Sequence, residues 1–287
     1  MSGEAGSDAD LHRELRRLAE SAAHAAGAVA HEMFRRPVAV RRKPDGSEVS
    51  DADERAQQAA IRAIRLRRPN DLFVAEESQP DAKPRGAGSA AGAALNASAT
   101  GAVHWIIDPI DGTRNYLRGV PLYACSIAAM VGGMPVAGVV YVPETDTLYS
   151  TSTGEPLRVN DTPANAAPPA EAGRKPVVAV PSSADSAARE LMLDWLSRTV
   201  IRNLGSTALH LALVATGEFD GAMANDCRLW DIAAGWLLIR SAGGAITTPE
   251  GRPVFPLDPA RYAGEALPCV AGRSAAVLRE LTNVAEQ

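Results

Sequence analysis

Cysteine is scarce in this 287-residue chain, where it occurs at Cys125, Cys227 and Cys269. The three residues are far apart, odd in number and without Cys-x-x-Cys spacing, which disfavours both a disulfide framework and a zinc site. Buried free thiols in a reducing compartment fit this pattern better. We therefore predict a cytoplasmic protein.

Long apolar runs are also missing from the sequence. No run reaches the roughly 18 residues that a membrane-spanning helix requires. The stretch from Met1 to Asp10 is polar and acidic and lacks the apolar segment of a secretory signal. These absences predict a soluble protein without a membrane partner.

Positive charge is not in excess, because the formal net charge is -5. Sequence-independent nucleic-acid binding needs clustered Lys and Arg, so this function is disfavoured. Nucleotide-binding α/β proteins are disfavoured as well, since the chain has no GxGxxG run and no Walker-type Gly-Lys-Ser/Thr run. A small anionic substrate is compatible with the charge, because bound metal ions supply local positive charge.

Aliphatic residues are plentiful in this chain and aromatic residues are few. Hydrophobic residues make up 46% of the chain and aromatic residues 5%, so the core is expected to consist of small and branched aliphatic side chains. The length exceeds that of one typical domain, which indicates either one large fold or two fused subdomains.

The first half of the chain combines helical and strand patterns. Leu11, Leu15 and Leu18 begin an apolar repeat of three or four residues that predicts a helix as far as Phe34. Residues 80–102 are rich in Gly, Ala, Ser and Pro and lack apolar periodicity, so we predict a loop there. The other predicted elements are a helix over 52–67, strands over 72–75 and 105–107, and antiparallel strands over 123–131 and 136–141.

The second half shows a regular alternation of strand and helix. This alternation favours a layered α/β arrangement. The predicted strands and helices, in chain order, are 177–180, 184–198, 200–203, 206–216, 219–223, 231–242 and 245–248.

Acidic residues adjoin apolar strands or helix starts in three segments. Glu76 follows one short strand, Asp108 and Asp111 follow another, and Asp231 begins a predicted helix. A carboxylate beside buried strands is costly unless it is paired or bound to a metal. Carboxylate oxygens suit hard cations such as Mg²⁺. For any one of these segments taken alone, an acid that merely caps a turn or a helix is a better explanation than a metal ligand.

Together, these segments resemble a known family. Residues 105–113 (Trp-Ile-Ile-Asp-Pro-Ile-Asp-Gly-Thr) and 230–235 (Trp-Asp-Ile-Ala-Ala-Gly) are similar to the two signatures of the inositol monophosphatase superfamily, whose members are Mg²⁺-dependent, Li⁺-sensitive phosphatases. The resemblance extends from about Leu11 to Leu281. It includes the runs at 76–78, 205–208 and 213–217.

The resemblance implies a fold of α+β and α/β type, a five-layered αβαβα sandwich of the sugar-phosphatase kind. An N-terminal α+β subdomain, residues 1–150, would carry the metal-binding motifs. A C-terminal α/β subdomain, residues 151–287, would contribute Asp231 and substrate contacts. Relatives are commonly homodimers, so a homodimer is the implied assembly.

The resemblance also implies ligands for two to three Mg²⁺ ions. Glu76 and Asp108 would hold the first ion together with the backbone carbonyl of Ile110. Asp108, Asp111 and Asp231 would hold the second, and a third, weaker ion would share Glu76. Two metals about 3.5–4 Å apart clamp the attacking and leaving oxygens of an in-line displacement.

Thr113 and Asp53 are the implied catalytic residues. Thr113 would orient the attacking water, and Asp53 would accept the proton or hydrogen bond of the Thr113 hydroxyl. The alternative for Asp53 is an acid in the first turn of a helix, where the helix dipole favours negative charge. No Ser, Cys or His nucleophile is needed, and the five histidines are predicted to be structural or solvent-facing.

Substrate contacts are expected around two glycine-containing segments. Free N–H groups at a helix start point toward an incoming phosphate, and Gly112, next to Thr113, permits a close approach of the backbone. By resemblance, Gly205, Ser206 and Thr207 also bind the substrate.

One position departs from the inositol-specific pattern. In inositol-specific members, a glutamate seven residues before the Trp-Asp aspartate binds the substrate hydroxyls, and Ala224 stands at that position here. Losing a buried acceptor for a substrate hydroxyl weakens discrimination. Asn225 and Asp226 follow, but neither has the same spacing, so the sequence does not assign inositol 1-phosphate.

The predicted function is hydrolysis of a small phosphorylated metabolite, similar to inositol monophosphate, by metal-activated water. The first alternative is a phosphatase acting on 3′-phosphoadenosine 5′-phosphate or histidinol phosphate. The second, from another class, is a phosphometabolite-binding protein without turnover. The enzyme is favoured because neither the acidic ligands nor Thr113 are replaced.

Overall fold

The computed structural model describes residues 2–42, 48–77, 102–164 and 173–282. Apart from residue 102, the predicted loop over 80–102 lies outside these ranges. The elements as far as residue 164 are α1 (Ser2–Met33), β1 (Val40–Arg42), β2 (Glu48–Ser50), α2 (Asp51–Arg65), β3 (Leu72–Ala75), β4 (Val103–Asp111), α3 (Thr113–Leu117), β5 (Ala124–Val131), β6 (Met134–Val142), the 3-10 turn Pro143–Thr145, β7 (Thr147–Ser152), β8 (Arg158–Val159) and β9 (Thr162–Pro163).

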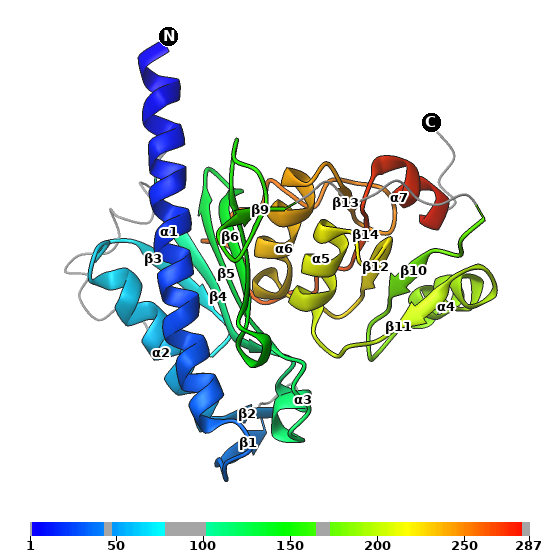
Figure 1. The fold of residues 1–287 in the computed structure, drawn as a ribbon, viewed down its shortest axis with the longest axis horizontal. Helices are drawn as coiled ribbons and strands as arrows, with labels where there is room; N and C mark the ends of the chain where they lie inside the picture. The colour runs from blue at the N-terminus through cyan, green and yellow to red at the C-terminus, as the bar shows by residue number, and fades with distance from the viewer. Residues whose placement is uncertain (1, 43–47, 78–101, 165–172, 283–287) are drawn as a thin grey trace.

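The remaining elements form the other end of the molecule in Figure 1. From β10 to β13, strands and helices alternate as the sequence predicts. In chain order they are β10 (Val177–Ala179), α4 (Ser186–Arg198), β11 (Val200–Arg202), α5 (Thr207–Thr216), β12 (Gly221–Ala224), α6 (Leu229–Ser241), β13 (Ala245–Thr247), β14 (Cys269–Gly272) and α7 (Ala275–Thr282).

The elements are stacked in five layers (Figure 1). Helices α1 and α2 cover one face of the first sheet, α5 and α6 lie between the two sheets, and α4 and α7 cover the outer face of the second sheet. This is the αβαβα sandwich that the resemblance implied. The division at residue 150 stays a prediction, and the first sheet continues beyond that residue through β8 and β9.

The first sheet has the strand order β3-β4-β5-β6-β7-β8-β9, and its pairs are antiparallel except for β3 with β4. Successive side chains of a strand point to opposite faces. Ile107 and Val139 therefore pack toward α1 and α2, whereas Ile106 and Val140 pack toward α5 and α6. Because both faces are covered, these strands are continuous apolar runs rather than alternating ones.

The second sheet is mixed, with the order β11-β10-β12-β14-β13. Strand β10 pairs in parallel with β11 and β12, while β14 runs antiparallel between β12 and β13. The four predicted strands and three predicted helices of this half are confirmed. Strand β14 was not predicted, because its four residues follow a long irregular stretch and carry no periodic signal.

Helix α1 begins at Ser2, ahead of the predicted start at Leu11. The residues before Leu11 are small and polar, so the apolar repeat that revealed the helix is missing from this segment. Figure 1 shows the start of α1 projecting beyond the sheet, where no core is available to select apolar side chains.

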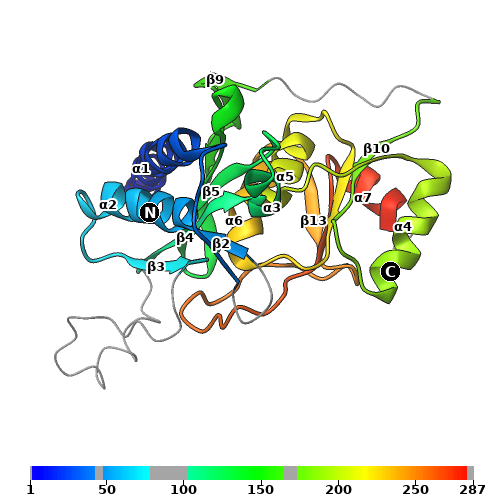
Figure 2. The same cartoon turned by 90° about the horizontal axis from the view of Figure 1, so that it is seen from below.

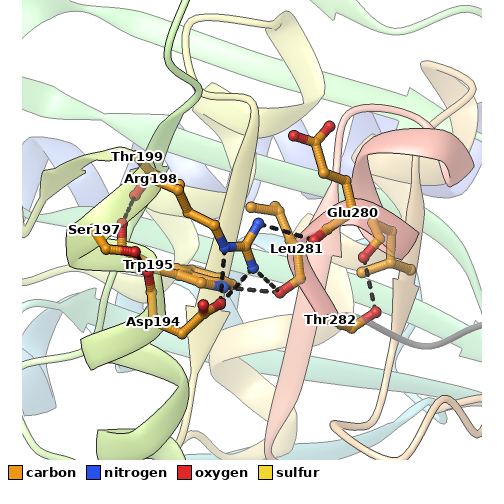
Figure 3. A network of polar contacts seen from close by, with 9 residues as sticks. Asp194, Trp195, Ser197, Arg198, Thr199, Glu280, Leu281 and Thr282 are labelled. Carbon is orange, nitrogen blue, oxygen red and sulfur yellow. Dashed lines mark hydrogen bonds and ion pairs between the residues drawn. The ribbon is translucent and has the colours of Figure 1, made fainter.

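Helices α4 and α7 are joined at their C-terminal ends (Figure 3). The buried Trp195 donates from Nε1 to the Leu281 carbonyl at 2.9 Å, and Arg198 donates from Nη2 to the same oxygen at 3.0 Å. Arg198 Nη1 also donates to the Glu280 carbonyl at 2.9 Å. The last carbonyls of a helix lack intrahelical partners, so these donors complete the end of α7.

Arg198→Met should lower the free energy of unfolding by about 1–3 kcal/mol, because it leaves carbonyls at the end of α7 with fewer donors. Urea denaturation measures this change. Arg189 lies exposed on the same helix, and Arg189→Met should change the free energy of unfolding by less than about 0.5 kcal/mol. Equal losses in the two variants would show that the contact between α4 and α7 contributes nothing specific.

Candidate active site

A β-bulge in β4 places two of the predicted acids on the same side of the first sheet. Asp108 pairs with Ser126 of β5 and Asp111 pairs with Ala124, so three steps on β4 match two steps on β5. On a regular strand, side chains three residues apart point to opposite faces. The extra residue of the bulge reverses this relation. Pro109, which has no N–H to donate to a neighbouring strand, lies inside the bulge.

The third acid comes from the start of α6. Oδ2 of Asp231 accepts a hydrogen bond from the backbone N–H of Arg228 at 2.6 Å, in the first helical turn, where the helix dipole favours negative charge. The Ser126 hydroxyl on β5 donates to the Trp230 carbonyl at 2.8 Å. This bond ties the start of α6 to the strand beside Asp108.

Three carboxylates therefore meet between the two sheets. Oxygens of Asp108, Asp111 and Asp231 lie within 4.8 Å of one another. Burial raises the pKa of all three groups, that of Asp111 to about 7, and the neighbouring negative charges raise the pKa of Asp108 and Asp231 further. A cation among these oxygens would offset both the desolvation and the repulsion, and an all-oxygen donor set suits Mg²⁺.

Glu76 stands beside this cluster at the end of β3. Its backbone N–H donates to the Ile107 carbonyl at 3.1 Å and continues the parallel pairing of β3 with β4. The negative charge of Glu76 contributes to the raised pKa of Asp108, Asp111 and Asp231. The structure thus brings the four predicted acidic residues within electrostatic range of one another.

The start of α5 holds Asp111 in place. Ser206 Oγ donates to Asp111 Oδ2 at 2.5 Å, and the backbone N–H of Ala208 donates to the same oxygen at 2.6 Å. Ser206 Oγ also accepts from the N–H of Leu209 at 3.2 Å and so caps the helix. Ser206, predicted as a substrate contact, uses its hydroxyl here to orient an acidic residue.

Thr113 and Asp53 are in contact. Thr113 Oγ1 lies 3.3 Å from Asp53 Oδ1 and 3.0 Å from the carbonyl oxygen of Ile110, and its single proton is donated toward these acceptors. Oδ2 of the buried Asp53 accepts from the N–H and the hydroxyl of Ser50, at 2.8 and 2.6 Å. The contacts of Asp53 therefore fit both of its predicted roles, an acid in the first turn of a helix and an acceptor for Thr113.

Two glycines and one asparagine fix the backbone next to Thr113 and next to Ser206. Gly112 has φ +98°, and a Cβ there would lie 3.1 Å from the Leu122 carbonyl oxygen. Gly205 has φ +74°, and a Cβ there would lie 2.6 Å from Nδ2 of Asn115. That amide donates to the carbonyls of Leu122 and Leu204, at 2.7 Å each. The bond to Leu204 links α3 to the segment just before α5; Figure 2 shows α1 and α2 toward one end of the molecule and α4 and α7 toward the other.

Asn115 and Ser126 are site residues that sequence reasoning missed. Each acts through a backbone carbonyl far away in the sequence, which leaves no local pattern to detect. Gln57 is a third, since its Oε1 accepts from the N–H of Glu77 at 2.9 Å and supports the end of β3.

A cavity of about 270 Å³ adjoins the acidic cluster, with Glu76, Asp111 and Asp231 in its wall. Its wall also includes all of the predicted substrate residues, which are Gly112, Thr113, Gly205, Ser206 and Thr207. A wider hollow of about 460 Å³ lies between the end of α1 and α3. Its wall includes Arg35, Arg36 and Arg118 and contains none of the acidic residues of the cluster.

Residues 11–282 match the sequence profile of the Inositol monophosphatase family. The chain belongs to this family. The inositol-1-monophosphatase of Mesorhizobium japonicum is 36% identical over 220 residues, which cover 73% of this chain and 75% of the relative. A Neisseria meningitidis relative named putative Nus factor SuhB is 32% identical over 208 residues, covering 71% of this chain and 74% of the relative.

Solved structures of the family have the same fold. The extragenic suppressor protein suhB of Bartonella henselae superposes with a TM-score of 0.76 at 27% identity, covering 93% of this chain and 96% of that chain. The inositol monophosphatase of Anabaena superposes with a TM-score of 0.73 at 25% identity, covering 94% of both chains. Within the described residues, no helix combines the length and the apolar character needed to cross a membrane.

Ala224, which stands where the resemblance led us to expect a glutamate, lies buried in β12 and packs in the core. It is absent from the described wall of the cavity, whereas the following Asn225 and Asp226 belong to that wall.

His210 lines the cavity from α5 as a neutral side chain. It is buried, and its Nε2 accepts a hydrogen bond from the backbone N–H of Leu204 at 2.9 Å. Burial lowers the pKa of His210 to about 4. The hydrogen bond agrees with the structural role that the sequence predicts for this histidine.

The lowered pKa makes His210 a source of acid sensitivity. Because the folded state favours the neutral ring, this contribution to stability is complete above about pH 6.5 and is lost as the pH falls toward 4. His210→Gln removes the titrating group. Wild type should lose up to about 3 kcal/mol more of its free energy of unfolding than this variant between neutral pH and pH ~4. Urea denaturation across this range tests the difference, and parallel pH curves would contradict it.

Proposed function

We propose that this family member is a Mg²⁺-dependent phosphomonoesterase that hydrolyses a small phosphorylated metabolite with an activated water molecule. One observation carries the proposal, the convergence of Asp108, Asp111 and Asp231 on one point beside a cavity. Buried acids of one sign are unfavourable without a compensating charge. A divalent cation is the partner that fits their oxygen donors.

The proposed ligand sets divide these acids between two ions. Glu76 and Asp108 would hold one Mg²⁺ with the carbonyl of Ile110, and Asp108, Asp111 and Asp231 would hold the second, with a third ion sharing Glu76. When bound, Mg²⁺ supplies the positive charge that activates water and stabilises the departing oxygen. Asp108 is the ligand shared by both sets, and it lies deepest among the acids, at 2% exposure.

The reaction is hydrolysis of a phosphate ester. A water oxygen forms a bond to phosphorus, the bond between phosphorus and the ester oxygen breaks, and the alcohol leaves with a proton. The Thr113 hydroxyl donates its own proton toward Asp53 or Ile110, so its lone pairs are directed to accept from the attacking water. The backbone of Gly112 and the segment Gly205–Thr207 line the space for the phosphate.

The names of relatives favour a substrate similar to inositol monophosphate. Ala224 supports the alternatives, a phosphatase for 3′-phosphoadenosine 5′-phosphate or histidinol phosphate, because the wall offers no glutamate at that position. A phosphometabolite-binding protein without turnover is disfavoured by the complete acidic set and by Thr113. We also propose a cytoplasmic homodimer with the two-part division of the chain described above.

Asp111→Asn should reduce Mg²⁺-dependent phosphate release from a generic phosphomonoester by at least about 100-fold, because a ligand loses its charge. Asp258 is an acid outside the cavity with a 45% exposed side chain, and Asp258→Asn should retain wild-type activity. Phosphate release by the Asp111 variant that is undiminished and resistant to EDTA would refute the metal-dependent mechanism.

Thr113→Val removes the hydroxyl at nearly constant volume and should lower kcat by about 10²–10⁴-fold with little change in Mg²⁺ affinity. Thr113→Ser keeps the hydroxyl and should recover most of kcat. Steady-state kinetics together with calorimetric Mg²⁺ titration separate the two effects. A valine variant with wild-type kcat would exclude Thr113 from the chemistry.

A further inference from the structure

Arg114 is the single permanent cation among the described residues that line the active-site cavity. It follows Thr113 directly on α3, so it stands beside the position proposed for the reacting phosphate. His210, in the same wall, is neutral because burial lowers its pKa. The remaining charged groups of the wall are carboxylates, and the chain as a whole has a net charge of -5.

The Arg114 guanidinium is not engaged by the protein. Its side chain is exposed, and within the described ranges no carboxylate or carbonyl lies at ion-pair or hydrogen-bond distance from it. Glu48 of β2 belongs to the same wall but does not pair with it. A planar guanidinium with five N–H donors is suited to bind phosphate or carboxylate in a bidentate manner.

Two other polar side chains of the wall, Asp226 and Ser182, have partners within the protein. Asp226 accepts from Arg228 Nη1 at 2.8 Å. Ser182 Oγ lies 3.3 Å from Oδ1 of Asn203. Arg114 differs from these two groups in having no partner among the described residues.

We propose that Arg114 binds a second anionic group of the substrate, so that the site prefers phosphomonoesters that carry another phosphate or a carboxylate. This inference rests on the proposed phosphatase function. One phosphate would lie against the acids and their cations, and the second anion would lie at the α3 edge.

Matched substrate pairs test the proposal with Mg²⁺ and full-length protein. The pairs are 3′-phosphoadenosine 5′-phosphate with adenosine 3′-phosphate, fructose 1,6-bisphosphate with fructose 1-phosphate, and 3-phosphoglycerate with glycerol 1-phosphate. Phosphate release gives kcat and KM for each. The first two pairs report on a second phosphate and the third on a carboxylate.

Wild type should show at least about a tenfold higher kcat/KM for the doubly anionic member of one or more pairs, through a lower KM; tenfold corresponds to about 1.4 kcal/mol. Arg114→Gln should abolish most of this preference, and Arg114→Lys should keep part of it, since the charge remains without the planar fork. Arg118→Gln is the control, because Arg118 caps the C-terminal end of the same short helix but lies in the wall of the other hollow. This variant should keep the wild-type preference.

Two results would overturn the inference while leaving the phosphatase proposal intact. The first is a preference below about threefold in every pair, and the second is an unchanged preference in Arg114→Gln. Absence of phosphate release from every compound in the presence of Mg²⁺ would instead refute the proposed function itself, and this inference with it.

Discussion

Mutual repulsion among buried carboxylates is the constraint on which the rest of this structure depends. Asp108, Asp111 and Asp231 hold their oxygens within 4.8 Å of one another, and burial raises the pKa of each. No fold keeps such an arrangement for stability alone, since replacing one acid by an apolar residue would relieve it. The arrangement becomes favourable when a divalent cation neutralises the charges, and this requirement connects the fold to hydrolytic chemistry.

The surrounding architecture supplies the fixed positions that the acids need. A bulge turns Asp108 and Asp111 to one side of β4, and the helix start at Arg228 directs Asp231 toward them. The start of α5 restrains Asp111 through Ser206. These contacts come from strands and helix ends rather than from long loops, so the donor oxygens lie in place before any ion binds.

Much of this site could be predicted from the sequence, because its acids stand beside apolar strands in recognisable runs. The five layers followed from the same resemblance, and four strands and three helices of the second half, from β10 to β13, followed from the pattern of the sequence, whereas β14 and α7 were not predicted. What escaped prediction depends on long-range contacts. Strand β14 pairs with β12, although α6 and β13 lie between them in the chain, and Asn115 donates to the carbonyl of Leu204, 89 positions away. Neither relation leaves a local signal.

The acidic cluster is the basis of the proposed reaction, and Arg114 is the basis of the proposed substrate preference. The central claim concerns the cations, and diffraction from crystals soaked in Mn²⁺, a metal that suits carboxylate ligands, tests it most directly. We expect anomalous peaks in contact with Asp108, one next to Glu76 and the other next to Asp111 and Asp231. Crystals that show no anomalous peak among these carboxylates at saturating Mn²⁺ would contradict it.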